Sequence, residues 1–253
     1  MKNPPRLFAC AVLGLLAPVL TLLASPLEQP LAVTPAPRLV SHSWMSLATW
    51  YRMHADQVEQ AEKGDAKVVF VGDSITEGWH WGEGALWKEH FEPMQSLNLG
   101  IGGDMTQNVL WRLQHGAATN LDPDYVICLI GTNNFGHTDE GPEAVAEGVF
   151  EVVRLLQEKF SNAQIACYGV FPRSEFSDHP DRAKIRELNA RVSEVDNWER
   201  VTFLDIGEQF LDAQGSIPSS LMPDFLHLSP EGYAIWAESI LDWMASFDTL
   251  PRR

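Results

Sequence analysis

The sequence predicts a three-layer α/β fold built on a doubly wound, five-stranded parallel sheet. Five short apolar runs recur along the chain, each bounded by turn residues, and most are continuous, as in strands covered on both faces. Helical patterns lie between the runs, and this alternation is typical of parallel sheets with crossover helices. Among such sheets we expect the flavodoxin-like strand order. The expected strands are 67–72 (KVVFVG), 96–101 (SLNLGI), 125–131 (YVICLIG), 164–170 (QIACYGV) and 201–206 (VTFLDI).

The expected helices follow from apolar stripes and from end signals. Pro142 starts one helix because proline is well tolerated in a first turn. Ser229 and Pro230 open the C-terminal helix, and Gly116 ends a short helix that begins near Thr106. The stripes consist of Val145, Val149, Val152, Leu156 and Phe160; of Ile185, Leu188, Val192 and Val195; of Trp236, Ile240, Trp243 and Phe247; and, in an N-terminal helix, of residues that include Leu47, Trp50 and Tyr51.

The N-terminus has the layout of a secretory signal. Lys2 and Arg6 precede an uncharged apolar stretch that ends in small residues, so residues 1–25 are expected to be a signal peptide, with an uncleaved membrane anchor as the alternative. Residues 26–42 carry four prolines and are expected to be a spacer. One catalytic domain is expected over 43–250.

Composition limits the partners and the redox chemistry. The 253-residue chain has a formal net charge of −16, which disfavours nucleic acid and anionic lipid as partners. Cys10 lies in the expected signal peptide. Cys128 and Cys167 lie in apolar runs, where buried thiols are expected and a disulfide is the alternative. Neither has a second Cys or His at metal-ligand spacing.

Polar groups follow the expected strands at the points where they end. Because the carboxyl ends of parallel strands share one edge of a sheet, and ligands bind there, we expect these groups to meet. Each group alone has a simpler explanation as a helix cap, a turn or a structural histidine. The groups are Asp73-Ser74, Gly102-Gly103-Asp104, Thr132-Asn133-Asn134 and, before the last helix, Asp224 with His227.

These groups together are what acyl transfer requires. The Ser74 hydroxyl needs a base to remove its proton, His227 titrates near neutral pH, and Asp224 can hold one tautomer of the imidazole. The oxyanion of a tetrahedral intermediate needs hydrogen-bond donors. The Ser74 N–H, the Gly103 N–H and the Asn133 side chain are the candidates, and Gly103 lets a substrate approach closely because it has no Cβ.

The same residues resemble the GDSL, or SGNH, hydrolase family. Its four blocks occur in order as VGDSITEGW, NLGIGGDMTQNVLWRL, IGTNNFGH and MPDFLHLSPEGY, between residues 67 and 240. The long second block and the DFLHL segment are most similar to the catalytic subunits of platelet-activating factor acetylhydrolase type I. The resemblance implies an SGNH fold and a serine hydrolase that releases short acyl groups, with no metal or organic cofactor. It implies a Ser-His-Asp triad of Ser74, His227 and Asp224 and an oxyanion hole of Ser74, Gly103 and Asn133.

Five further side chains have two interpretations each. Ile75 and Leu226 flank the candidate nucleophile and base and are weak candidates for an acyl pocket that favours acetyl groups; core packing explains them equally well. Trp79 and Trp81 either stack on a leaving group or form a hydrophobic plug. Asp73 is expected to be a structural loop acceptor rather than a catalytic carboxylate.

The sequence therefore predicts a secreted serine esterase that acts on a small acetylated lipid, sugar or alcohol, with a homodimer as one possible state. Two other classes remain open. A metal-assisted phosphoesterase would use Asp73, Asp104, Asp224 and His227 as ligands. A non-catalytic binding module on the cell surface is the other.

Overall fold

The computed structural model describes residues 29–81 and 84–248 and centres on one parallel sheet. The strands lie in the order β2-β1-β3-β4-β5, and every neighbouring pair is parallel. This confirms the doubly wound, flavodoxin-like prediction. The ladder along β2 is shorter than its apolar run. The strands are β1 Val68–Gly72, β2 Ser96–Asn98, β3 Tyr125–Leu129, β4 Gln164–Tyr168 and β5 Val201–Leu204.

The helices connect the strands as crossovers or short turns. The α-helices are α1 Leu47–Glu62, α2 Ser74–Glu77, α3 Thr106–Arg112, α4 Thr132–His137, α5 Pro142–Lys159, α6 Pro180–Val192 and α7 Pro230–Asp248. The 3-10 segments are η1 Leu31–Val33, η2 Gly78–His80, η4 Glu92–Met94, η6 Ser193–Asn197 and η7 Gly207–Phe210. Two segments have π-helical hydrogen bonding, η3 Trp87–Phe91 and η5 Leu113–Ala117. Helix α4 and segment η3 had no counterpart among the predicted helices.

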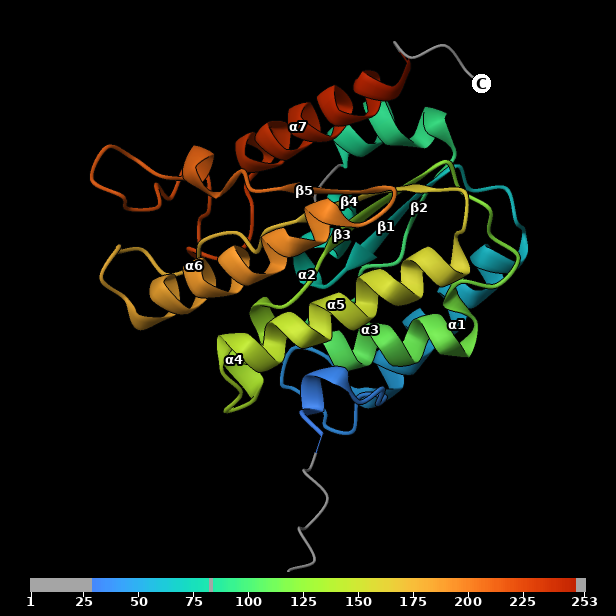
Figure 1. Cartoon of the computed structure of the whole chain (residues 1–253), viewed down its shortest axis with the longest axis horizontal. Helices are drawn as coiled ribbons and strands as arrows, with labels where there is room; N and C mark the ends of the chain where they lie inside the picture. Colours follow the sequence, from blue (N-terminus) through green and yellow to red (C-terminus); the bar gives the residue numbers. More distant parts are fainter. Residues whose placement is uncertain (1–28, 82–83, 249–253) are drawn as a thin grey trace, which may run out of the picture.

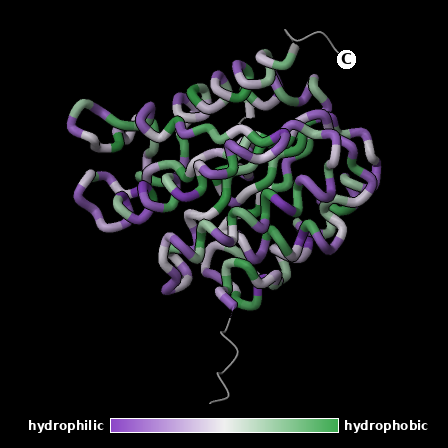
Figure 2. The backbone as a smooth tube through the Cα atoms, viewed as in Figure 1, coloured by the Kyte–Doolittle hydropathy of each residue, from purple (hydrophilic) through white to green (hydrophobic). Residues whose placement is uncertain are grey.

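Two apolar cores lie on the two faces of the sheet, because successive strand residues point to opposite sides. Val69 and Val71 of β1 face a core shared with α1, α3, α5 and α6. Val68 and Phe70 face the other core, which α7 completes together with Trp79, Trp87 and Phe91. Figure 1 shows α7 on the side of the sheet opposite to α1, α3 and α5. In Figure 2 the central strands are the most continuously hydrophobic part of the backbone.

Cys128 and Cys167 are register partners on the neighbouring strands β3 and β4. Both are buried free thiols. Burial raises the pKa of both thiols, that of Cys167 to about 12. The structure therefore agrees with the buried-thiol interpretation of both residues.

Residues 31–45, which we call the strap, pack on the domain where a free spacer was expected up to residue 42. Ala32 is fully buried, and its carbonyl accepts a hydrogen bond from the Thr106 hydroxyl at 2.8 Å. The Ala36 N–H donates to the Gln107 carbonyl at 3.1 Å, and the Asn108 side chain donates to the Ala36 carbonyl at 3.0 Å. The difference arises because prolines limit backbone conformation without preventing burial. The strap lies beside α3 and α5 in Figure 1.

The expected signal peptide, residues 1–25, lies outside the described residues. Within residues 29–81 and 84–248, no helix combines the length and the apolar character needed to cross a membrane.

Strand β1 ends in a buried carboxylate that caps the next helix. Asp73 is 1% exposed, and its Oδ1 accepts the Ile75 N–H at 3.0 Å at the start of α2. The predicted role as a loop acceptor therefore matches its contacts. Burial is the main cause that raises the pKa of Asp73 from 3.8 to about 7, and the nearby Asp104 charge adds to it.

Replacing Asp73 by Asn should change how stability depends on pH. Between about pH 4 and 7 the unfolded carboxyl is ionised while the folded one keeps its proton, so unfolding releases a proton and rising pH favours it. The free energy of unfolding of the wild type should therefore fall relative to Asp73→Asn between about pH 4 and 7, by at most about 1.4 kcal/mol per pH unit, and level off above the folded pKa of about 7. Urea denaturation of both proteins across this range measures the difference. Parallel stability curves would contradict the raised pKa.

Candidate active site

Three side chains from opposite ends of the domain form one hydrogen-bonded chain. Ser74 is the first residue of α2, directly after β1. Its Oγ lies 2.9 Å from Nε2 of His227, and Nδ1 of His227 lies 2.7 Å from Oδ2 of Asp224. Ser74 and His227 are 153 positions apart in the chain. The structure thus joins the three residues that the sequence selected as nucleophile, base and carboxylate.

The segment before α7 holds Asp224 and His227 in place locally. The other carboxylate oxygen of Asp224, Oδ1, accepts the backbone N–H groups of Leu226 at 3.1 Å and of His227 at 2.7 Å. Partial burial works to raise the pKa of Asp224, but the hydrogen bonds and charge of His227 outweigh it and keep this pKa below its ordinary value. Asp224 therefore stays an acceptor facing Nδ1, which leaves Nε2 to face the serine.

The loop after β2 brings Gly102 and Gly103 to the same strand end. The Ile101 N–H donates to the Gly72 carbonyl at 3.4 Å, and a Cβ placed on Gly102 would lie 3.6 Å from the Ser74 Cβ. Gly103 has a φ of +73°, a region that favours glycine. A Cβ on Gly103 would collide with the Trp44 ring. Trp44 of the strap therefore occupies the side of Gly103 where a Cβ would lie.

Asn133 reaches the same loop from α4. Its Nδ2 donates to the Asp104 carbonyl at 3.0 Å, and the residue is 9% exposed. An amide nitrogen carries two hydrogens, so this bond leaves one for another acceptor. Its neighbour Asn134 is fully buried and bonds to Thr106 and Gln107 instead. The two adjacent asparagines therefore have different contacts. Asn133 binds the glycine loop, whereas Asn134 binds the start of α3.

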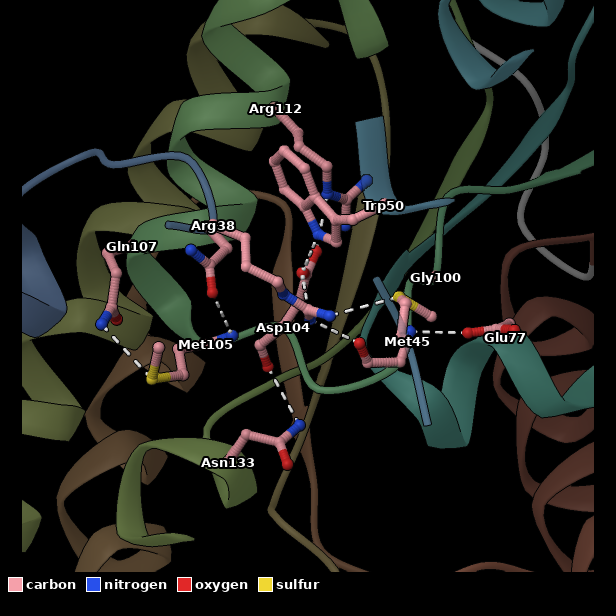
Figure 3. A network of polar contacts seen from close by, with 12 residues as sticks. Arg38, Met45, Trp50, Glu77, Gly100, Asp104, Met105, Gln107, Arg112 and Asn133 are labelled. Atoms are coloured by element: carbon pink, nitrogen blue, oxygen red, sulfur yellow. Dashed lines mark hydrogen bonds and ion pairs between the residues drawn. The ribbon is translucent and has the colours of Figure 1, made fainter. Parts of the chain in front are cut away.

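A buried ionic network holds the glycine loop, and sequence analysis did not predict it. Asp104 is fully buried; its Oδ2 accepts from Arg112 Nε at 2.7 Å, and its Oδ1 accepts from Trp50 Nε1 at 2.7 Å and Arg38 Nη2 at 3.2 Å. Figure 3 shows Arg38, Trp50 and Arg112 converging on this carboxylate, with Asn133 on its backbone. Arg38 and Trp50 reach Asp104 from 66 and 54 positions away in the chain, whereas Arg112 is 8 positions away.

Of the weaker candidate site residues, two are buried in the core and two are partly or largely exposed. Ile75 is 2% exposed and packs in the core on the α7 side, which favours its packing interpretation, whereas Leu226 is half-buried. Trp79 is buried among aromatic rings, as expected for a plug. Trp81 is 44% exposed, and its ring centroid lies 5.3 Å from that of His227. It borders a pocket of about 430 Å³ whose other described lining residues are Gly78, Trp79, Gly84, Ala85, Leu86, Leu228, Pro230 and Tyr233.

The candidate ligands of the metal-assisted alternative have other partners. Asp104 is ion-paired with Arg38 and Arg112, and Asp73 caps α2. Across the described part of the chain, no group of three or more His, Cys, Asp or Glu side chains is arranged to hold a metal ion.

Comparisons with known proteins identify relatives of this chain. The model of the GDSL-like Lipase/Acylhydrolase family matches residues 70–235. Platelet-activating factor acetylhydrolase IB subunit alpha1 from Bos taurus is 38% identical over 189 residues, which cover 73% of this chain and 77% of the relative. The human alpha1 subunit is also 38% identical, over 185 residues, with 73% and 78% of the two chains covered.

Solved structures share the fold. A GDSL-like lipase from Bacteroides thetaiotaomicron superposes with a TM-score of 0.65 at 22% identity, covering 78% of this chain and 97% of the other. A carbohydrate acetylesterase from Sinorhizobium meliloti gives 0.57 at 19% identity, with 72% and 100% covered. The resemblance inferred from the four sequence blocks is confirmed: the chain belongs to the GDSL-like lipase/acylhydrolase family and is a carboxylic ester hydrolase.

Proposed function

We propose that this hydrolase is a serine esterase that removes short acyl groups, acetyl above all, from a small acetylated lipid, sugar or alcohol. The observation that carries the proposal is the continuous chain from Ser74 through His227 to Asp224, with bonds of 2.9 and 2.7 Å. The acetyl preference is supported by the acetylhydrolase relatives at 38% identity. Export is proposed from the basic and apolar N-terminus alone.

In the proposed reaction, Ser74 Oγ attacks the ester carbonyl while His227 Nε2 takes the hydroxyl proton. Asp224 stabilises the imidazolium that forms and keeps the ring oriented. The carbonyl oxygen becomes an oxyanion and accepts hydrogen bonds from the Ser74 N–H, the Gly103 N–H and the second Asn133 hydrogen. The intermediate then collapses, and His227 returns the proton to the departing alcohol oxygen.

The second half of the reaction repeats these roles with water. His227 takes a proton from a water molecule, which attacks the acyl carbon on Ser74, and the oxyanion forms against the same donors. The collapse breaks the bond to Ser74 Oγ, which regains its proton from His227, and the free carboxylic acid leaves. His227 and Asp224 have exposed side-chain fractions of 28% and 58%, so solvent reaches the base for this step.

An organophosphate should label Ser74 covalently and stop turnover. The label should be absent from Ser74→Ala. In His227→Ala it should fall to a few per cent of the wild-type level, because the hydroxyl needs the imidazole to become a nucleophile. Peptide mass spectrometry locates the adduct, and ester hydrolysis is measured in parallel. A chelator serves as the control and should leave activity unchanged. If the chelator abolishes turnover while Ser74→Ala retains it, a metal-assisted reaction replaces this proposal.

Replacing Asn133 by Ala should lower kcat about 10² to 10³-fold, the usual effect of losing one oxyanion donor. The matched control is Asn134→Ala, which removes an adjacent buried amide whose partners among the described residues are Thr106 and Gln107. That control should lower the melting temperature but change kcat less than about threefold. Steady-state kinetics on p-nitrophenyl acetate and thermal melts distinguish the two. A loss below about threefold for Asn133→Ala would exclude it as an oxyanion donor.

A chain-length series of p-nitrophenyl esters should show the acyl preference. We expect kcat/KM to be highest for acetate and to fall at least about tenfold by octanoate, since excess acyl length is rejected by side chains near the nucleophile. The variant Leu226→Ala should improve octanoate relative to acetate if this half-buried side chain limits the pocket. Equal kcat/KM values across the series would contradict an acetyl preference. Size-exclusion chromatography of the same sample measures whether the chain is a monomer or a homodimer.

A further inference from the structure

The strap contributes one charged side chain to the interior of the domain. Arg38 is 5% exposed and lies outside residues 70–235, the range matched by the family model. Its Nη1 lies 3.2 Å from the Met45 sulfur, and its guanidinium carbon lies 5.5 Å from the Trp44 ring centroid and 5.9 Å from that of Trp50. These contacts on several sides fix the direction of the guanidinium fork.

The same guanidinium bonds to the loop that carries the proposed oxyanion donor. Arg38 Nη2 donates to the Gly102 carbonyl at 2.5 Å, and it also reaches Asp104 Oδ1 at 3.2 Å. On the other side of Gly102, its N–H donates to Glu77 Oε2 at 2.6 Å. The charged side chains of Arg38 and Glu77 therefore hold the carbonyl and the N–H of Gly102, respectively. Figure 3 shows Arg38 and Glu77 approaching the loop from different elements.

The geometry of a peptide unit gives this contact a consequence at Gly103. The Gly102 carbonyl and the Gly103 N–H belong to one planar trans peptide, so they point in opposite directions. Binding the oxygen to Arg38 therefore fixes the Gly103 N–H on the side away from the guanidinium. A charged donor on the carbonyl also polarises the peptide and makes its N–H a better donor.

A peptide between two glycines needs such a restraint. Glycine populates positive and negative φ about equally, and Gly103 lies at +73°. Rotation of this peptide would turn its oxygen, rather than its N–H, toward an oxyanion. Trp44 adds to the restraint because its ring fills the position where a Cβ of Gly103 would lie.

We propose that Arg38 is a positioning residue for ester hydrolysis, which fixes and polarises the Gly102–Gly103 peptide so that the Gly103 N–H can bind the oxyanion. The proposal rests on the function proposed above for Gly103. It makes the strap part of the catalytic unit although the strap lies outside the range matched by the family model.

The test uses Arg38→Met, which removes the donor, and Arg38→Lys, which keeps a cation beside Asp104 but lacks the fork that serves Asp104 and Gly102 together. Active sites are counted by organophosphate labelling, and kcat and KM are measured on p-nitrophenyl acetate. Affinity for a small alkylboronic acid, which forms a tetrahedral adduct on a serine, reports on the oxyanion donors without turnover.

We expect Arg38→Met to lower kcat about 30 to 100-fold with KM changed less than about threefold, since the loss cannot exceed that of an oxyanion donor. Boronic acid affinity should fall in parallel. Arg38→Lys should lower kcat and boronic acid affinity about tenfold while staying folded, so the proposal can be tested even if Arg38→Met does not fold. The matched control is Arg112→Lys, which disturbs the other ion pair of Asp104 without touching Gly102; it should lower the melting temperature at least as much but kcat less than about fivefold.

The proposal is overturned if Arg38→Lys keeps wild-type kcat and boronic acid affinity, or if a folded Arg38→Met does so. It is also overturned if Arg112→Lys loses as much kcat as the Arg38 variants. If the proposed function itself is wrong, the result is distinguishable, because Ser74→Ala would then retain turnover. If Ser74→Ala and Asn133→Ala lose activity as expected while the Arg38 variants do not, only the role of Arg38 is wrong.

Discussion

The pairing of one fully buried carboxylate organises this end of the domain. Asp104 has no contact with solvent, and an unpaired charge in such a place is strongly destabilising. Its side chain therefore needs Arg38 from the strap, Trp50 from α1 and Arg112 from α3, while its carbonyl accepts from Asn133. The strap and α1, 66 and 54 positions away, and the neighbouring helix α3 must meet at this residue before its charge is compensated. The glycine loop just before Asp104 is fixed as a consequence.

The two halves of the proposed catalytic machinery are held by different means. The donor half, around Gly103 and Asn133, is held by buried hydrogen bonds from the strap and α4. The acid–base half, Asp224 and His227, is more exposed and is held by hydrogen bonds within residues 224–227. Donors that stabilise developing charge act best when they need no reorganisation, whereas a base that activates water must be reached by solvent. The distribution of burial matches these two requirements.

The sequence was sufficient for the parts of the fold that depend on local patterns. The strands, their order and the convergence of Ser74 and His227 follow from apolar periodicity and from the rule that strand ends share one edge. Helix α4 was missed because its six residues carry no apolar stripe. The strap was expected to be a spacer because its prolines and alanines resemble a linker. The burial of Arg38 depends on Asp104, 66 positions away, and no local pattern encodes such a pairing.

The pocket beside His227 bears on how the proposed enzyme would select its alcohol group. In the proposed reaction His227 protonates the leaving oxygen, so the leaving group lies on the side of that ring, where Trp81 borders the pocket. The described lining residues carry no charged side chain, and the Tyr233 hydroxyl already donates to the Ile75 carbonyl at 2.8 Å. Apolar contact discriminates between substrates only by about 1 to 3 kcal/mol per methylene. Where the alcohol contacts these described apolar residues, its size and shape would influence binding.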